Sequence, residues 1–465
     1  MNINQRIGNR FFICLILFCL LCVNLNAQTP DQESQNQTAA PIRISLDEAV
    51  ELAMRNNLSL ESSRIGLETR RRASNLSWNQ FIPNITVAGA YSRENERGTI
   101  TGVDFSTFTP YSTNSPQWAF SIPIQASLNI SMAMFENMKR LRLDYESGLI
   151  GYDKARIQLE RDVRKAYHNM LLLQENIELL RVSFANVERQ VQMAQANYNA
   201  GLAPELTLLQ ARVARENMRP IIDQAENGLK LSMAQFAMFL GMNYNTEFEL
   251  VPFTGNIDFI SLDTTEMISR ASRDKPEVRE LIQTIRILES ARRMQLFSLT
   301  PALTLSWNTM PTYVGDPGNR WVNPTPGSLT ISLGLRLNSL IPFSQDFQGV
   351  RNLDDQIRMA NIGLAQLVNG TEIEIYNIVL ALERTRVSAN AQAQTVNLAQ
   401  QAYRLTEQAY QAGLQDYFQV QNAQQSLHQA RVQMLEQQFN YLNGLIDLEY
   451  AIGVPFGTLS TRSGE

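Results

Sequence analysis

Cysteine is almost missing from this 465-residue chain, and its three copies, Cys14, Cys19 and Cys22, all lie within the first 22 residues. The remainder can therefore form no internal disulfide. There are only two histidines, His168 and His428, and neither has a second histidine or cysteine at metal-ligand spacing. The chain also lacks a phosphate-binding glycine loop, a nucleophile elbow and a zinc-protease helix. We expect no catalytic residues, no bound metal and no cofactor.

Long apolar runs are missing as well. After residue 27 no uninterrupted apolar segment reaches the roughly 20 residues that a membrane-spanning helix needs. The one early run, Phe11–Val23, follows Arg6 and Arg10 and precedes Leu25-Asn26-Ala27, an order typical of a secretory signal peptide. We expect residues 1–27 to be a signal peptide and the mature protein to be exported. If that protein enters a membrane, strands must cross it.

A lipoprotein start at Cys22 is the alternative to ordinary signal cleavage, although Leu21 before it is larger than the small residue that lipid attachment normally prefers. Positive charge is also scarce. The chain has a net charge of −5, and signal removal would take away two of its cations. We therefore expect no nucleic-acid partner, because binding to phosphate backbones depends on lysine and arginine.

What the chain does contain is a long internal repeat. The segments "NYNAGLAPELTLLQA" (197–211) and "AYQAGLQDYFQVQNA" (409–423) share the pattern Tyr-x-Ala-Gly-Leu, with equivalent residues 212 positions apart. Three further pairs of segments match in the same order: 45–57 with 261–275, 81–92 with 298–309, and 239–242 with 451–454. Self-similarity over this distance predicts two structural repeats, 28–260 and 261–465, that form one unit.

Each repeat contains two predicted strands, about 84–92 and 117–131 in the first and about 302–310 and 328–338 in the second. Apolar and polar residues alternate along them, which is typical of a strand with one apolar face. The apolar positions, which we expect to face lipid if the strands cross a membrane, include Trp118, Phe120, Ile122, Ile124, Leu329, Ile331 and Leu333. Pro123 cannot donate a ladder hydrogen bond, so we expect it at a bulge or an unpaired edge. Polar loops, 93–116 and 311–327, connect the two strands of each pair.

Two architectures remain open on this pattern. A soluble β-sandwich shows the same alternation, but four strands in two distant pairs are few for a sandwich. A membrane barrel needs about eight strands at least, so one chain cannot close it. Closure would require more copies, with eight strands in a dimer or twelve in a trimer.

Long helices fill the rest of each repeat. The segment from about 135 to 200 has no proline, and about 66 residues at 1.5 Å each give a rod of about 100 Å. Two shorter helices, about 59–80 and 204–240, can line that rod end to end, and 276–298 with 415–452 can line the second rod, 346–412. Short helices open at Ser45, with Glu48 completing a capping box, and at Ser261.

The Gly-Leu corners join the long helices to the helices that return. We expect Gly201 and Gly413 in the left-handed conformation, with Leu202 and Leu414 as apolar clamps beneath them. The neighbouring segments 190–204 and 387–403 carry no charged residue and are rich in alanine and amide side chains. This composition favours closely packed helices that are wetted on two faces.

This duplicated order of elements resembles the TolC-type outer membrane efflux protein family. The residues that carry the resemblance are "SLDEAVELAMRNN", Pro83 and Pro301 before the strands, "SLIPFSQDFQG" after the fourth strand, and both Tyr-x-Ala-Gly-Leu corners. The resemblance covers the mature chain and implies a mainly α-helical fold with membrane strands. It implies a homotrimer whose twelve strands form a β-barrel among outer membrane lipids, continuous with a twelve-helix α-barrel in the periplasm.

The family also implies a periplasmic tip at the corners 200–204 and 412–416. There a periplasmic adaptor protein would dock on Gly201, Leu202, Gly413 and Leu414. A pore constriction would lie just inside, at positions where relatives carry charged residues. Here those positions read Gln415, Gln419 and Asn422, with Thr207 after the first corner and Tyr410 at the aromatic position. We expect a neutral gate held by amide and tyrosine hydrogen bonds.

The sequence therefore predicts an outer membrane channel that passively exports substrates delivered by an inner-membrane transporter, either an RND-type pump or an ABC exporter. The alternative is a secreted coiled-coil scaffold or adhesin without channel activity. Substrate identity is not encoded in these patterns, because selectivity in such a system lies mostly in the pump.

Overall fold

The computed structural model describes residues 42–96, 98–104, 106–252, 264–315, 319–322, 327–337 and 341–461. Residues 43–465 form one compact unit. The expected signal peptide and Cys22, the expected cap Ser261, and Asn338 at the end of a predicted strand lie outside the described residues. So do parts of the loop 311–327 and the expected boundary between the two repeats.

The helices of the first half follow the predicted order. They are α2 (Leu46–Asn56), α3 (Leu58–Asn75), the 3₁₀ turn η1 (Ser77–Phe81), α4 (Met132–Asn199) and α5 (Glu205–Phe239), with the short strands β1 (Ile42–Ile44) and β8 (Phe248–Leu250). The predicted capping box is confirmed: the Ser45 backbone N–H donates to Glu48 Oε2 at 2.8 Å, and the Glu48 N–H donates to Ser45 Oγ at 3.4 Å.

The second half repeats this series of helices. Its members are α6 (Thr264–Asp274), α7 (Pro276–Phe297), α8 (Gln345–Gln411), α9 (Tyr417–Ile452) and the short α10 (Thr458–Thr461). The long helices α4 and α8 have 68 and 67 residues, close to the predicted lengths. None of the described helices combines the length and the apolar character that crossing a membrane would need.

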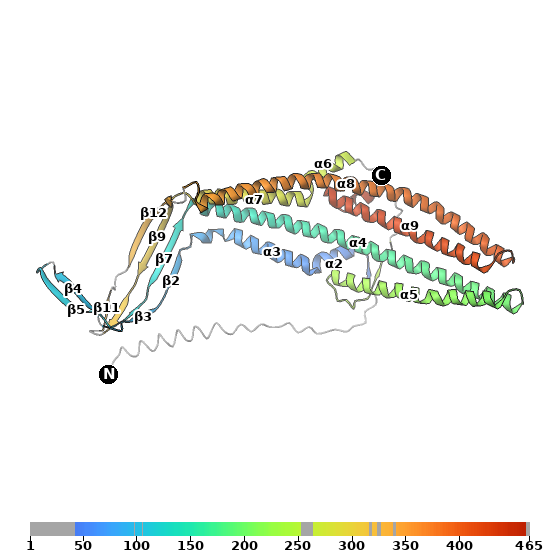
Figure 1. The fold of residues 1–465 in the computed structure, drawn as a ribbon, viewed down its shortest axis with the longest axis horizontal. Coiled ribbons are helices and arrows are strands. Elements are labelled where there is room, and N and C mark those ends of the chain that lie inside the picture. The colour runs from blue at the N-terminus through green and yellow to red at the C-terminus, as the bar shows by residue number, and fades with distance from the viewer. Residues whose placement is uncertain are drawn as a thin grey trace, which may run out of the picture. The chain divides into compact units, whose positions relative to one another are not determined.

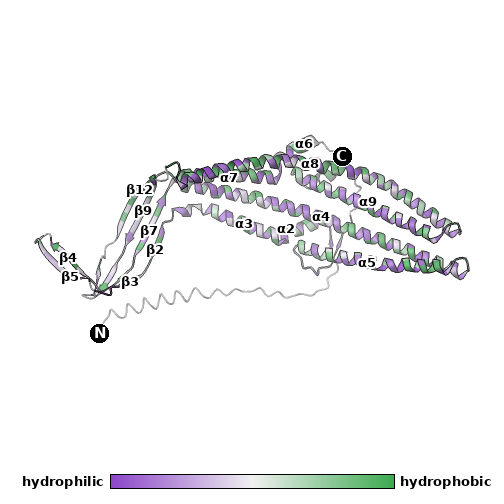
Figure 2. Cartoon of the chain, viewed as in Figure 1, coloured by the Kyte–Doolittle hydropathy of each residue, from purple (hydrophilic) through white to green (hydrophobic). Residues whose placement is uncertain are grey.

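The helices pack side by side as a wall. Nearest the strands the contacts run α3–α4–α7–α8, and nearest the corners they run α5–α4–α9–α8 (Figure 1). Each long helix is thus lined by two shorter ones placed end to end, as the length arithmetic predicts. Polar and apolar residues are mixed along every rod (Figure 2), as expected of helices with two wet faces.

Eight of the described strands form two four-stranded antiparallel sheets at one end of this wall. One sheet has the order β12-β9-β7-β2 and the other β11-β10-β6-β3. The strands are β2 (Asn84–Val87), β3 (Ala90–Arg93), β6 (Trp118–Ser121), β7 (Ile124–Ile130), β9 (Ala302–Thr309), β10 (Thr312–Gly315), β11 (Arg320–Val322) and β12 (Ser328–Gly334). The chain crosses the two sheets in four passes, each made of one strand from either sheet. In the first three passes, a strand of one sheet continues into a strand of the other after a two-residue break.

The prediction of an unbroken strand over 117–131 is therefore wrong in one detail. The ladder stops at Ile122-Pro123, and the neighbouring passes stop at the same level, at Ala88-Gly89 and Met310-Pro311. Pro123 lies in a central pass, not at an edge, and its carbonyl accepts from the Ala88 N–H at 3.1 Å. Because proline has no N–H to donate, two prolines at one level interrupt the ladder across adjacent strands.

The loop 93–116 also differs from expectation. It contains a β-hairpin, β4 (Thr99–Asp104) and β5 (Thr109–Asn114), whose strands pair with each other and with no other described strand. Its turn includes Phe108 at φ 51°, an uncommon conformation for a non-glycine residue.

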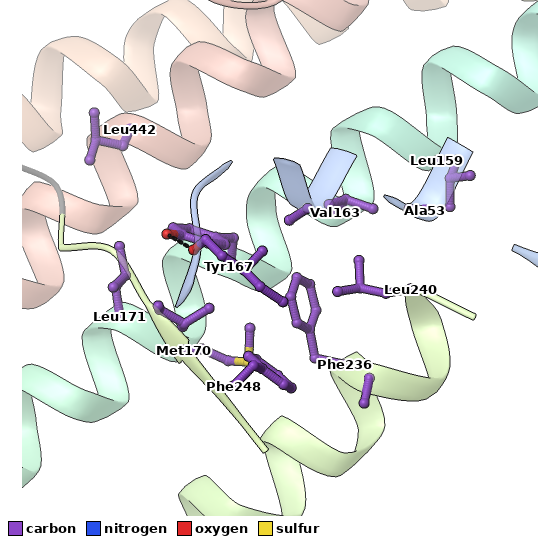
Figure 3. Close-up of a cluster of buried hydrophobic side chains, with 14 of the residues drawn as sticks. Ala53, Leu159, Val163, Tyr167, Met170, Leu171, Phe236, Leu240, Phe248 and Leu442 are labelled. Atoms are coloured by element: carbon purple, nitrogen blue, oxygen red, sulfur yellow. Dashed lines mark hydrogen bonds between the residues drawn. The ribbon is translucent and has the colours of Figure 1, made fainter. Parts of the chain in front are cut away.

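A compact core holds α2, α4, α5 and β8 together (Figure 3). Val163 and Tyr167 of α4 are buried against Phe236 of α5 and Phe248 of β8. The Tyr167 hydroxyl lies 3.0 Å from the Ile44 carbonyl and 2.8 Å from the Val251 carbonyl, next to the two short strands. The small β1–β8 layer is thereby fixed to one face of the long helix.

Candidate channel-forming surfaces

Strand register gathers the apolar side chains on one face of the sheet. Ile85, Ala126, Trp307 and Leu329 lie opposite one another across all four passes. The next rows on this face are Leu128, Leu305 and Ile331, and then Ile130, Leu303 and Leu333. Polar residues such as Gln125 and Asn308 fill the intervening rows and point to the other face. The predicted lipid-facing residues Ile124, Leu329, Ile331 and Leu333 thus share one surface, and Trp307 joins them.

An aromatic row borders this apolar face. Tyr91, Phe120, Tyr313 and Trp321 lie directly opposite one another in the register of β3, β6, β10 and β11. Trp118 joins the row, with ring centroids 6.5 Å from Tyr91 and 5.7 Å from Tyr313. Ile122, also predicted on this surface, lies in the strand break, where its N–H donates to the Pro311 carbonyl at 3.0 Å.

The distance along the strands from the aromatic row to the start of the helices can be compared with the height of the apolar band in membrane barrels. From Phe120 to Ile130 a strand rising about 3.3 Å per residue and tilted about 40° would climb about 25 Å, the height of the apolar band in membrane barrels, which aromatic girdles flank. The described face therefore has the dimensions and the border of a membrane-facing surface.

Each lateral edge of the sheet is without a neighbouring strand among the described residues. The outer strands are β2 and β3 on one side and β11 and β12 on the other, and each pairs with one described strand only. Every residue of β2, β3 and β12 is exposed, whereas central β7 and β9 are mostly half-buried. Unpaired, apolar strands of this kind are templates for pairing with another chain.

The helical wall has matching edges, α5 on one side and α8 on the other. Each carries a stripe of exposed residues on the side away from its packed neighbour. The α5 stripe is Leu206, Val213, Pro220, Leu231 and Met238, and the α8 stripe is Leu380, Val387, Leu398 and Leu405. Spacings of 7 and 11 residues keep both stripes on one helix face.

The predicted left-handed glycines are confirmed at both corners. Gly201 has φ +74° and Gly413 has φ +73°. At the first corner the Leu202 N–H donates to the Asn197 carbonyl at 2.8 Å and the Gly201 N–H donates to the Tyr198 carbonyl at 2.9 Å. The same pair of bonds recurs at the second corner. Both are Schellman motifs, which satisfy the last carbonyls of the long helices.

The expected apolar clamp at these corners is wrong. Leu202 is 79% exposed and Leu414 is 78% exposed. A clamp needs an apolar residue one turn back, at the third position from the helix end. That position holds polar Asn197 at the first corner and small Ala409 at the second. The two leucines therefore project into solvent.

Expected constriction residues occupy two environments. Gln415, Gln419 and Asn422 are exposed and Thr207 is half-buried, whereas Tyr410 is only 7% exposed. The Tyr410 ring packs 6.3 Å from that of Tyr417 in an apolar cluster between the helices. Burial raises the pKa of Tyr410, and raises that of Tyr417 to about 12, so both phenols are neutral at pH 7.

Sequence reasoning missed a buried amide pair behind the corners. Gln190 of α4 is fully buried and its Nε2 donates to Gln424 Oε1 of α9 at 2.8 Å. Gln424 Nε2 in turn donates to the Ser183 carbonyl at 2.9 Å, and Ser183 Oγ lies 3.1 Å from His428 Nδ1. The charge-free, glutamine-rich composition of 190–204 was the only signal. Polar groups buried this deeply require such partners.

The other histidine has a similar structural role. His168 Nδ1 lies 3.2 Å from Asn443 Oδ1, and burial lowers the pKa of its imidazole, which is therefore neutral at pH 7. Among the residues that the structure describes, no group of three or more histidine, cysteine, aspartate or glutamate side chains could hold a metal ion.

Comparison with known proteins shows what this chain is similar to. Residues 49–241 match the sequence model of the family described as "Outer membrane efflux protein". Nodulation protein T of Rhizobium leguminosarum bv. trifolii is 18% identical over 384 residues, which are 81% of this chain and 79% of that protein.

Solved structures extend the likeness to nearly the whole chain. A structure of CusC, whose report concerns folding and transmembrane channel formation, aligns with a TM-score of 0.70 at 15% identity and covers 92% of this chain and 97% of its own. The outer membrane protein VceC of Vibrio cholerae aligns with a TM-score of 0.70 at 15% identity, covering 88% of this chain and 96% of its own. At such identities the structures establish the fold.

The family match also gives the location, the outer membrane with a periplasmic extension. Residues 49–241 thus match the outer membrane efflux protein family in sequence, and about nine-tenths of the chain shares the fold of solved outer membrane channels.

Proposed function

We propose that three copies of this chain close into one channel that passively conducts substrates out of the periplasm. Twelve strand passes would form the barrel in the outer membrane, and the helical walls would form a tunnel below it. The chain would perform no chemistry. Its two halves, 28–260 and 261–465, would each supply half of one copy's share of the ring, with corners and strands at equivalent positions.

One observation carries the proposal: the two helical edges match each other. Counted from the corners, Leu405 and Leu398 of α8 lie at nearly the same height as Val213 and Pro220 of α5, and Val387 and the residues beyond it continue the match. The α5 stripe of one copy would therefore pack against the α8 stripe of the next, as in an antiparallel coiled coil. Such a contact between unlike surfaces generates a ring when its rotation closes.

The free edges of the sheets support the same side-by-side arrangement of copies. The strands β2 and β3 continue from the α3 side of the wall, and β12 leads to α8, so sheet and helices have their free edges on the same two sides. Pairing with a neighbouring copy would satisfy the backbone groups of these edge strands, which a membrane interior would otherwise leave without partners.

The corners are the proposed docking site for a periplasmic adaptor. Gly201, Leu202, Gly413 and Leu414 lie at the end of the wall remote from the strands, and the exposed leucines offer an apolar contact. Energy would come from an inner-membrane transporter, of the RND or the ABC type, coupled through that adaptor. Outward movement of the helix pairs around the corners would widen the entrance.

Neutral side chains would line the constriction. Gln415, Gln419 and Asn422 are exposed beside the second corner, and Thr207 follows the first. Tyr410 would support this ring from behind, because it packs inside the wall.

Planar-bilayer recording tests the channel. Detergent-purified protein is expected to have the mass of three copies and to give discrete conductance steps. The Gln415→Ala variant should conduct more current, because the bulky glutamine side chain at the entrance is replaced by a methyl group. A stable monomer that gives no steps would contradict the proposal and favour a scaffold without channel activity.

A further inference from the structure

A collar of apolar and basic side chains lies at the junction between the strands and the long helices. We call this set the junction collar. Its exposed apolar members are Trp78, Ile82, Phe135, Ile341 and Phe343, and its basic members are Arg71, Arg72, Lys139 and Arg351. They come from the end of α3, the turn η1 and the residue after it, the start of α4, and the start of α8 with the turn before it, so every contributing segment lies near the sheet.

The basic members form no close ion pair, and Lys139 acts on the Glu136 carboxylate one turn away only as a nearby positive charge. Arg71, Arg72, Lys139 and Arg351 form no ion pair with any described residue. Arg72 Nη2 instead lies 3.3 Å from the Thr69 hydroxyl, and the guanidinium of Arg351 lies 5.2 Å from the Phe347 ring centre.

Arginines packed between the helices at the same level behave differently. Arg293 pairs with Glu136 at 2.8 Å, and Arg292 pairs with Asp354. The exposed cations of the collar are thus left without ion pairs in a chain of net negative charge. Such cations are available to an external anion.

The collar faces outward if the wall closes into a tunnel. On α4, Val163 and Tyr167 pack against the layer of α2, β1 and β8. This layer would obstruct the lumen of a tunnel if it lay inside, so we place it outside. The same helix face continues at helical spacing to Leu149, Met138 and Phe135. Phe135 and its neighbours in the collar are therefore on the outer surface, a step that rests on the proposed function.

The collar also has the chemistry of a membrane interface. It lies at the end of the apolar band opposite to the aromatic row of Tyr91, Phe120, Tyr313 and Trp321. Tryptophan and basic residues together are typical of the level of lipid headgroups. Guanidinium groups bind phosphate through paired hydrogen bonds.

We propose that the junction collar binds the phosphate groups of anionic phospholipids in the membrane leaflet nearest the helices. The apolar half of the collar favours a lipid over a free anion, because Trp78, Phe135 and Phe343 would contact acyl chains beside the headgroup. A soluble phosphate would use the cations and leave these side chains in water.

Native mass spectrometry of the detergent-purified protein tests this assignment, because lipid retention can be counted without membrane insertion. The wild type is expected to retain phosphatidylglycerol in preference to phosphatidylcholine. The variant Arg71→Gln, Arg72→Gln, Arg351→Gln should bind phosphatidylglycerol more weakly by on the order of 100-fold, since each interfacial cation contributes a factor of about five. Added NaCl should weaken the wild-type preference by screening.

A matched variant controls for net charge. Lys230→Gln, Arg273→Gln, Arg404→Gln removes three exposed cations outside the collar and should leave retention unchanged. Equal retention of both lipids by the wild type, or an undiminished preference in the collar variant, would overturn the proposal. Full displacement of phosphatidylglycerol by millimolar inorganic phosphate would also overturn it, by showing an anion site that does not use the lipid. Failure to conduct in bilayers would count against the proposed channel instead.

Discussion

At the scale of single residues, the corner glycines are required for their backbone conformation and not for space. A side chain added at Gly201 or Gly413 would meet no atom within 4 Å, but both residues have φ near +74°. In that region a Cβ crowds the following carbonyl, which costs about 1–2 kcal/mol for an ordinary residue. The sequence repeats glycine here because both long helices must stop and reverse.

Alanine substitutions separate conformation from packing. Gly201→Ala and Gly413→Ala should each lower the free energy of unfolding by about 1 kcal/mol through left-handed strain. Gly151→Ala is the matched control: Gly151 lies inside α4, where an added Cβ again meets nothing within 4 Å. That change should raise stability by up to about 1 kcal/mol, because alanine favours helix. Urea titration of the three variants gives the comparison, and equal effects at all three positions would refute the explanation.

At the scale of elements, the sheet shows the clearest separation of two faces. Ile331 lies in the apolar row with Leu305 and Leu128, while Ser332, its neighbour in β12, lies opposite Thr304 on the polar face. One residue along the strand therefore reverses the environment.

Arginine at these two adjacent positions tests the membrane-facing surface. Ile331→Arg should reduce the yield of folded, vesicle-inserted protein strongly, because an arginine facing the bilayer midplane costs about 2–4 kcal/mol. Ser332→Arg should insert nearly as well as the wild type, because its side chain would face the lumen. Heat-modifiable mobility on gels after insertion into vesicles reports the folded fraction. Similar losses in both variants would show that the predicted face is not the lipid-facing one.

Much of each element could be predicted from sequence, because local chemistry decides it. The Ser45–Glu48 box, the left-handed glycines and the lengths of α4 and α8 follow from capping preferences and from uninterrupted helical composition. Contacts between segments that are distant in the sequence were harder to predict. The pairing of β4 with β5 depends on cross-strand packing inside a polar loop, and the break at Pro123 depends on Pro311 reaching the same level in another strand.

The candidate functional surfaces likewise include features that the sequence predicts and features that it does not. Alternation alone placed Leu329 and Ile331 on one face, but the aromatic row requires the register among four strands that sequence does not provide. The exposure of Leu202 was mispredicted because the clamp depends on what stands one turn back, Asn197. Burial of Gln190 was invisible, since its partner Gln424 lies in the other half of the chain.

At the scale of the whole molecule, the described unit has apolar edges that no other described element covers. The outer strands, α5 and α8 all carry exposed apolar side chains along the edges of the unit. The inner strands and helices, in contrast, have packed neighbours on both sides. Covering those edges by further copies would supply much of the stability of the assembly, since burial of apolar surface is the main favourable contribution to association. Stability should then depend on protein concentration, as it does for obligate oligomers.

A pair of opposite charges across the proposed contact gives the most demanding test of this assembly. Leu405→Glu in α8 should shift the protein from three copies to one, because a carboxylate would be buried against the α5 stripe of the next copy without a partner. Adding Val213→Lys in the same chain should restore much of the trimer, since Val213 lies at nearly the same height on α5 and the two helices meet only between copies. Gln400→Glu, an exposed α8 residue that does not belong to the stripe, should leave the mass unchanged. Analytical ultracentrifugation in detergent reports the mass. A trimer that tolerates Leu405→Glu, or a monomer that Val213→Lys does not rescue, would show that α5 and α8 are not the surfaces on which the copies meet.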